Sequence, residues 1–258
     1  MSTHTHDRHE RHDRHDGPDR ADRYGAARPS VGEVLRPILL RGVLPGLLVF
    51  ALLIAVGKII MEPLDEIPSE EVIARWFVSG RTSVLNSVSH VFSTANDTWW
   101  TIGLAVVYAI IVLIATRKWW LSIVPLLAIT LESSIFVAAT HLVNRPRPGV
   151  AHLDPAPPTS SFPSGHTAAS FALYWSLMLI ASRIPNLALR RVIQTLCFVF
   201  PFLVGWARLY RGMHHLSDVL FGLALGIWCA FTAVACIRAA ERHAAERDAA
   251  PGRAPLSR

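Results

Sequence analysis

Three short polar segments interrupt an otherwise apolar chain and contain the residue types that phosphate chemistry requires. They read NRPRP at 144–148, FPSGHT at 162–167 and ARLYRGMHHLSD at 207–218. Together they supply fixed cations, a turn of small residues with a histidine, and a second histidine with a carboxylate one helical turn later. Phosphoryl transfer is catalysed mainly by positioning and by electrostatic stabilisation of the phosphoryl oxygens. The three segments therefore predict a phosphate-handling site.

The arginines of the first and third segments are the candidate phosphate ligands. A guanidinium group is planar, stays charged and forms bidentate bonds to phosphate. Arg145 and Arg147 alternate with prolines, which oppose helix formation and hold the chain extended, while Arg208 belongs to the third segment. The RPRP sequence alone is a weak signal, because many surface loops contain it. We expect these three side chains to surround a phosphoryl group.

The second segment places small residues at the predicted start of an apolar helix. Backbone N–H groups at a helix N-terminus attract anions, and Gly165 permits close approach of the backbone. Ser164 adds a hydroxyl donor, and His166 is placed to give a proton to a leaving oxygen. The alternative interpretation is a helix-capping turn with an incidental histidine at the membrane interface.

The third segment pairs histidine with aspartate at helical spacing. His214 and Asp218 are four residues apart and share a helix face, so the carboxylate can orient the ring of a nucleophilic histidine. His215 is three residues from Asp218 and could pair with it instead. A third interpretation is a capped helix start, with Ser217 or Asp218 as the N-cap. Spacing alone leaves these alternatives open.

The rest of the chain has the composition of a polytopic membrane protein. Of 258 residues, 52% are hydrophobic and only 17% are charged, and the apolar residues form long runs. Six runs approach the ~20 residues needed to cross a bilayer: Pro37–Met61, Trp99–Thr116, Trp119–Val143, His166–Ser182, Val192–Tyr210 and Leu216–Ile237. We predict an all-α protein with a six-transmembrane-helix bundle over residues 34–238.

The segments outside these runs complete the predicted organisation. Residues 1–33 are rich in His, Asp and Arg and nearly lack apolar residues, which predicts a disordered, solvated tail. A metal-binding role is the alternative, but the irregular histidine spacing implies no cage geometry. Residues 62–97 show apolar positions at near-helical spacing, which predicts one or two amphipathic helices on the membrane surface or capping the bundle. Residues 239–258 form a second tail. Glu132 falls inside the third run. A functional role for this carboxyl group and a structural hydrogen bond to a neighbouring helix are equally expected.

Basic residues in the short connections predict the orientation of the chain. They cluster before the first run, between the second and third, between the fourth and fifth, and after the sixth. With six crossings all four clusters fall on one side, which is the cytoplasm by the positive-inside rule. Both termini are then cytoplasmic, and the three polar segments meet at the non-cytoplasmic face of the cell membrane.

Composition also excludes several classes of protein. The formal net charge of +6 is concentrated in tails and loops and forms no basic stripe, so a nucleic-acid partner is not expected. Cys197, Cys229 and Cys236 all lie in apolar runs without a CxxC pair, which argues against a disulfide framework or a zinc site.

The three segments resemble the motifs of the type 2 phosphatidic acid phosphatase superfamily. That pattern is Lys, six residues, Arg-Pro; then Pro-Ser-Gly-His; then Ser-Arg, five residues, His, three residues, Asp. Residues 147–148 match the end of the first motif, 163–166 match the second completely, and Arg208, His214 and Asp218 match the third at the correct spacing. Two positions depart from it: Thr140 replaces the Lys, and Ala207 replaces the Ser. The resemblance covers roughly residues 98–237.

The resemblance implies a role for each matching residue. His214 would form a phosphohistidine with Asp218 as its partner, and His166 would protonate the leaving group. Four residues would hold the phosphoryl oxygens: Arg147, Arg208, Ser164 and Gly165. His141 or Arg145 could supply the charge of the missing Lys. Such enzymes need no metal ion.

The resulting expectation is an integral membrane phosphatase without a metal or cofactor. Its substrate would be a phosphomonoester or diphosphate of a lipid, such as a polyprenyl diphosphate, phosphatidic acid or phosphatidylglycerol phosphate. One alternative is a lipid phosphotransferase that uses the same intermediate. Another is a non-catalytic binder or transporter of lipid head groups, although retention of both histidines and the aspartate argues against it, since binding needs only cations.

Overall fold

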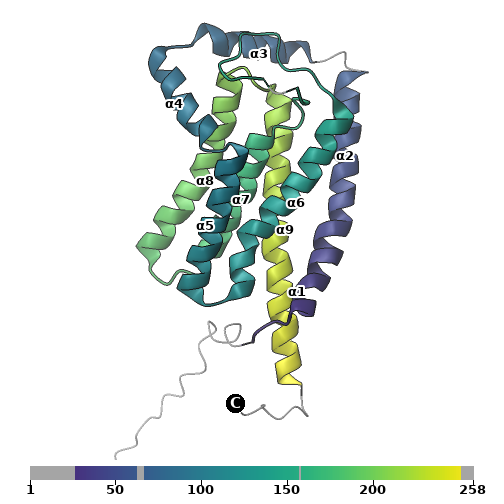
Figure 1. The fold of residues 1–258 in the computed structure, drawn as a ribbon, viewed down its shortest axis with the longest axis vertical. Helices are drawn as coiled ribbons and strands as arrows, with labels where there is room; N and C mark the ends of the chain where they lie inside the picture. Colours follow the sequence, from purple (N-terminus) through teal and green to yellow (C-terminus); the bar gives the residue numbers. More distant parts are fainter. Residues whose placement is uncertain (1–26, 63–66, 157, 251–258) are drawn as a thin grey trace, which may run out of the picture.

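The computed structural model describes residues 27–62, 67–156 and 158–250, and it is built from helices (Figure 1). The elements in chain order are α1 (Val31–Pro37), the π-helical η2 (Ile38–Val43), α2 (Leu44–Met61), α3 (Pro68–Ser79), α4 (Ser83–Thr94), α5 (Thr98–Thr116), α6 (Trp119–Val143), α7 (Gly165–Ala181), α8 (Leu187–Tyr210) and α9 (Leu216–Ala249). The fold is therefore all-α over the described ranges, as the sequence predicts.

Five helical segments are long and apolar enough to cross a membrane, and they identify an integral membrane protein. They are Val31–Met61, Thr98–Thr116, Trp119–Val143, Leu187–Tyr210 and Leu216–Ala249. The predicted fourth crossing corresponds to α7, which has 17 residues and a length of ~25 Å at 1.5 Å per residue. This helix lies inside the bundle, where Ala168, Phe171 and Leu173 are completely buried.

The backbones of α7 and α9 approach each other closely, and two glycines of α9 permit this. A Cβ atom on Gly222 would lie 2.5 Å from the carbonyl oxygen of Ser164, and one on Gly226 would collide with the carbonyl oxygen of Ala168. Ser164 also donates its backbone N–H to the Asp218 carbonyl oxygen at 2.9 Å. Main-chain contact therefore fixes the start of α7 against the start of α9, which brings the second and third polar segments together.

Of two short helices, α3 lies across one end of the bundle and α4 runs back from that end beside α8 (Figure 1). Arg81, between them, donates to the Tyr210 carbonyl oxygen at the end of α8, and the Tyr210 hydroxyl donates to Asn86 Oδ1 at 2.9 Å. Trp76 and Val84 remain exposed on the outer face of these helices. The predicted amphipathic segment therefore forms two helices that cover the end of the bundle where α8 ends and α9 begins.

The opposite end of the bundle gathers the first and last helices. Arg247 of α9 donates to Glu33 of α1 at 2.7 Å, and Arg183 and Trp120 both donate to Glu241 of α9. Helix α9 continues to Ala249, eleven residues beyond the predicted limit of the membrane domain at 238. The predicted His-rich tail lies mostly outside the described residues, and within them α1 already begins at Val31.

Candidate active site

A cavity of about 780 Å³ lies at the capped end of the bundle, between α5, α6, α7 and the end of α8. Five predicted site residues line it, namely Arg147, Gly165, His166, Arg208 and His214. The other three predicted site residues, Arg145, Ser164 and Asp218, are buried behind its wall. The structure thus brings both histidines and two of the three arginines to one space.

His214 presents one ring nitrogen to the cavity in a form that can act as a nucleophile. Its Nδ1 lies 2.8 Å from the Ser161 carbonyl oxygen, which can only accept, so Nδ1 carries the proton and Nε2 keeps its lone pair in the neutral ring. Burial is the main cause that lowers the pKa of His214 to about 4. The ring is therefore neutral near pH 7.

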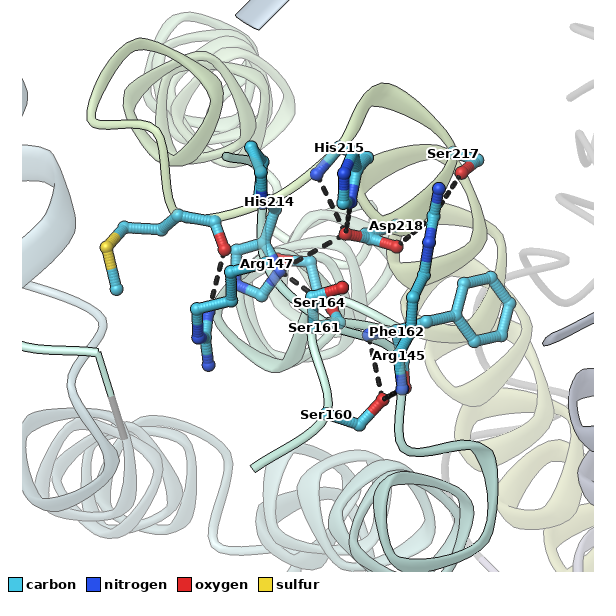
Figure 2. Close-up of polar contacts among 12 residues, drawn as sticks. Arg145, Arg147, Ser160, Ser161, Phe162, Ser164, His214, His215, Ser217 and Asp218 are labelled. Carbon is cyan, nitrogen blue, oxygen red and sulfur yellow. Dashed lines mark hydrogen bonds and ion pairs between the residues drawn. The ribbon is translucent and has the colours of Figure 1, made fainter. Parts of the chain in front are cut away.

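Asp218 is shared between the two adjacent histidines (Figure 2). Its Oδ2 accepts the backbone N–H of His215 at 2.8 Å and lies 3.2 Å from His215 Nδ1. The same oxygen lies 3.8 Å from His214 Nδ1, within ion-pair reach but beyond hydrogen-bonding distance. Both pairings that the spacing left open therefore exist, and the direct hydrogen bond of His214 goes to Ser161 rather than to the predicted partner Asp218.

Arg145 was predicted from the sequence to contact the phosphoryl group, but its side chain does not line the cavity. Its guanidinium group is fully buried and donates to Asp218 Oδ1 at 2.6 Å and to Ser217 Oγ at 2.7 Å (Figure 2). It also donates to Glu70 Oε2 at 2.7 Å. Two carboxylates and a hydroxyl thus occupy the group that was expected to hold phosphate. The prediction of Arg145 as a phosphate ligand is a poor fit, because its charge is neutralised by protein partners and it does not line the cavity.

Glu70 is a site residue that sequence reasoning missed. It belongs to the first turn of the capping helix α3, is only 5% exposed, and also accepts the backbone N–H of Ser217 at the start of α9. Carboxylates are stabilising at helix N-termini. The sequence shows an acidic first turn after Pro68, but nothing in it indicates that α3 contacts α9.

Arg147 and Arg208 each keep N–H donors without a protein partner in the described part of the chain. Arg147 Nη1 donates to the Met213 carbonyl oxygen at 2.7 Å, and Arg208 Nη1 donates to Ser93 Oγ at 2.6 Å and to Asp154 Oδ2 at 3.0 Å. The Nε atoms of both arginines are buried without a partner among the described residues. Both side chains line the cavity and are suited to an anion.

Asp154, in the connection between α6 and α7, was also missed by sequence reasoning. It accepts from Arg208 and, through both carboxylate oxygens, from Arg211. This loop carboxylate therefore orients Arg208 at the cavity wall.

The Pro-Ser-Gly-His turn holds the start of α7 against the start of α9, and the hydrogen-bond donors of Ser164 are used within the protein rather than facing the cavity. Ser164 uses its hydroxyl group with Thr167 Oγ1 at 3.0 Å and its N–H with Asp218, so it does not face the cavity. Gly165 does line the cavity, but a Cβ atom there would lie 2.5 Å from the ring of Phe136. The close approach that glycine permits is thus occupied by an aromatic ring, and the prediction of Ser164 as a phosphate ligand fits this arrangement poorly.

His166 has a carboxylate partner that the sequence did not reveal. Its Nε2 lies 3.0 Å from Oδ1 of Asp97, the residue that precedes α5. The position of Asp97 before an apolar run suggests only a helix N-cap. The structure instead shows a His–Asp pair at the mouth of the cavity, since Asp97 and His166 both line it.

The sequence matches the family model of the PAP2 superfamily over residues 121–242, a range that contains the start of α7, the end of α8 and the start of α9. This part of the chain is therefore a PAP2 superfamily domain. Phosphatidylglycerophosphatase B of Bacillus subtilis (strain 168) is 29% identical over 113 residues, which are 43% of this chain. The match spans about half the length, 55%, of that curated relative.

Two solved PAP2-related structures share the fold. A transmembrane PAP2-type phosphatidylglycerolphosphate phosphatase from Bacillus subtilis superimposes with a TM-score of 0.64 over 83% of this chain and 100% of that one, at 22% identity. LpxE from Aquifex aeolicus gives a TM-score of 0.51 at 27% identity, covering 63% of this chain and 92% of its own. At 22% identity the first likeness shows the fold alone.

The PAP2 pattern clarifies the position where this chain lacks a lysine. Thr140 lines the cavity and donates its hydroxyl group to the Val137 carbonyl oxygen within α6. Of the two substitutes considered from sequence, Arg145 is bound to carboxylates, whereas His141 lines the cavity. Within the described ranges, no group of three or more His, Cys, Asp or Glu side chains is arranged to hold a metal ion.

Proposed function

We propose that this protein is an integral membrane phosphatase that hydrolyses a phosphomonoester or diphosphate of a lipid. The observation that supports it best is the arrangement of His214, His166, Arg147 and Arg208 around one cavity, in a chain that contains a PAP2 superfamily domain. Nucleophile, acid and fixed cations are the groups that phosphoryl transfer requires.

The proposed reaction has two steps that use the same residues. His214 Nε2 attacks phosphorus, the bond between phosphorus and the leaving oxygen breaks, and His166 gives that oxygen a proton. His166 then takes a proton from a water molecule, whose oxygen attacks the phosphohistidine and releases phosphate. Arg147 and Arg208 hold the phosphoryl oxygens throughout, and we expect no metal ion to be needed.

Asp218 acts on this reaction through its neighbours. It receives Arg145 on one oxygen and faces both histidines with the other, so its charge lies beside the ring that becomes positively charged on phosphorylation. A carboxylate in that place stabilises the charged ring. We assign Asp218 and Arg145 to positioning and charge balance rather than to contact with phosphate.

For the membrane topology, we propose six crossings with both termini in the cytoplasm and the cavity at the outer face of the cell membrane. The contact between Glu33 of α1 and Arg247 of α9 supports an even number of crossings, because it joins the start of α1 to the end of α9 at one end of the bundle. The basic connections before α6 and before α8 lie at that same end (Figure 1). The positive-inside rule assigns this end to the cytoplasm.

The direct test is phosphate release by the purified full-length protein in detergent. We expect release from phosphatidic acid or a polyprenyl diphosphate in the presence of EDTA, and inhibition by vanadate, which mimics a phosphoryl group. Failure to release phosphate from any lipid mono- or diphosphate would contradict the proposed function. Activity that EDTA abolishes and a divalent metal restores would contradict the metal-independent mechanism alone.

The pH dependence of the reaction should report the neutral state of His214. Since burial lowers its pKa to about 4, the ring keeps its lone pair down to that pH and loses it on protonation below. We expect kcat/KM to fall as pH decreases through about 4, after correction for the second ionisation of the substrate near pH ~6. A corrected acid limb near pH ~6.5, the ordinary value for histidine, would show that the nucleophile is not a buried ring.

A further inference from the structure

The cavity continues along α5 and α6 beyond the residues assigned to phosphate. On this inner wall lie Asn96, Thr101 and Glu132, which are 3%, 4% and 1% exposed. Each retains polar atoms without a hydrogen-bond partner among the described residues: Nδ2 and Oδ1 of Asn96, Oγ1 of Thr101 and Oε1 of Glu132. Three buried polar side chains therefore face one space with unmet hydrogen-bonding capacity.

Asn96 lies beside Asp97 in the connection before α5, next to the proposed transfer site, and Thr101 and Glu132 extend from there toward the middle of the membrane. Thr101 is one helical turn from Asp97, whose carboxylate contacts His166. Glu132 is eight residues from Thr140 on α6, which corresponds to ~12 Å along the helix axis. The groups of a lipid that follow directly on its phosphate would pass along this wall.

The wall is polar at a depth where a polar group without a partner is costly. A buried donor or acceptor left unsatisfied destabilises the fold, and ionisable residues within membranes are rare and tend to mark substrate pathways. Glu132 makes no bond to a neighbouring helix in the described structure, since its recorded partner is the adjacent Ser133 hydroxyl at 3.1 Å. This disfavours the purely structural role considered from sequence.

The cavity also has an exit for hydrocarbon. Ile102 of α5 and Val137 of α6 both line it and are 44% and 48% exposed, so the wall between these helices opens on the side of the bundle. On a membrane-spanning bundle such a side faces lipid. Acyl chains can therefore leave the cavity into the bilayer while the polar part of the same lipid stays inside.

We propose that Asn96, Thr101 and Glu132 form a hydrogen-bonding subsite for the oxygen-rich glycerol ester region of an acylglycerol phosphate. This proposal rests on the proposed function and names its substrate class. Ester oxygens would accept hydrogen bonds from Asn96 Nδ2, from the Thr101 hydroxyl group and from the protonated carboxyl group of Glu132, whereas a polyprenyl phosphate presents only hydrocarbon after its phosphate. Placing hydrocarbon against them would leave the same groups desolvated and unpaired.

The experiment compares two phosphomonoesters, phosphatidic acid and a polyprenyl monophosphate, in mixed micelles with the full-length protein. The parent should show the higher kcat/KM with phosphatidic acid. Thr101→Val keeps the side-chain shape and removes the hydroxyl group, and Glu132→Leu removes the carboxyl group. We expect each to lower the ratio of kcat/KM between phosphatidic acid and polyprenyl phosphate by about tenfold, which corresponds to one lost hydrogen bond.

Two further variants separate recognition from folding. Thr101→Ser retains the hydroxyl group and should restore the ratio toward that of the parent. Ser134→Ala removes an exposed hydroxyl group of α6, which bonds to the Thr130 carbonyl oxygen, and should leave the ratio unchanged. Variants of lower thermal stability are still informative, because the ratio is measured on one preparation.

The outcomes distinguish this inference from the function on which it rests. Hydrolysis of both lipids with an unchanged ratio in Thr101→Val and Glu132→Leu would overturn the subsite and leave the phosphatase intact. A parent that prefers the polyprenyl phosphate would overturn the substrate class in the same way. Release of phosphate from neither lipid, nor from any other lipid phosphate, would overturn the proposed function and this inference together.

Discussion

His214→Ala should reduce phosphate release from a lipid phosphate by at least about a thousandfold, because the proposed reaction then has no nucleophile. His215→Ala should cost far less. Its ring hydrogen-bonds to Asp218 at 3.2 Å, but it does not line the cavity. The variants His214→Ala and His215→Ala are therefore a matched pair, because each removes one imidazole ring from neighbouring positions. Initial rates in detergent with phosphatidic acid provide the measurement.

A second readout separates loss of the nucleophile from loss of structure. Thermal unfolding should show similar midpoints for the two histidine variants, since both rings are buried in the same loop. Acid quenching is unsuitable for a phosphohistidine, so labelled protein should be recovered under alkaline conditions and be absent in His214→Ala. The assignment fails if His214→Ala retains activity close to the parent. Large loss in His215→Ala alone would exchange the two roles.

Arg145→Leu should cause the largest loss of stability among single substitutions at the site. The guanidinium group is completely buried between Glu70 and Asp218, at 2.7 and 2.6 Å, and its removal leaves two buried carboxylates without their cation. Removing one partner of a buried ion pair costs about 3–5 kcal/mol. We therefore expect a clear fall in the unfolding temperature of the detergent-solubilised protein, accompanied by loss of activity through displacement of Asp218.

Arg75→Leu is the matched control for this substitution. Arg75 faces Glu71 at 4.0 Å on the exposed side of α3, and exposed ion pairs contribute about 0–1 kcal/mol. Its unfolding temperature should remain near that of the parent. If Arg145→Leu instead keeps the unfolding temperature of the parent and shows only a raised KM, then Arg145 binds phosphate as the sequence suggested. In that case the ion pairs of Arg145 with Glu70 and Asp218 do not stabilise the fold.

The helices were predictable because their signal is local. Runs of about 20 apolar residues require no knowledge of the partners they pack against, and α5, α6, α8 and α9 coincide with such runs. The predicted limits of the first and last membrane helices were less accurate, because the structure extends them to Val31 and to Ala249. Helix α9 continues to Ala249 because Glu241 and Arg247, polar residues beyond the apolar run, form ion pairs with Arg183 and Glu33. Those partners are distant in sequence, so hydropathy could not reveal them.

The site was predictable only where a residue type implies its role. His166, His214, Arg147 and Arg208 were identified from spacing and chemistry, and all four line the cavity. Arg145 was assigned from its guanidinium group and its proline neighbours, but the side chains it contacts come from α3 and the start of α9, 72 to 75 residues away. The carboxylates that organise the site could not be found for the same reason. They are Glu70, Asp97 and Asp154, each brought in by tertiary contacts.

The close main-chain contact between α7 and α9 has a consequence for biosynthesis. His166 precedes His214 by 48 residues, and His214 directly precedes α9, which must dock through Gly222 and Gly226 before the two rings share one space. A nascent chain that has inserted every earlier helix still lacks this arrangement. The pocket is therefore completed only when the last helix leaves the ribosome and enters the bilayer, so incomplete chains cannot assemble it.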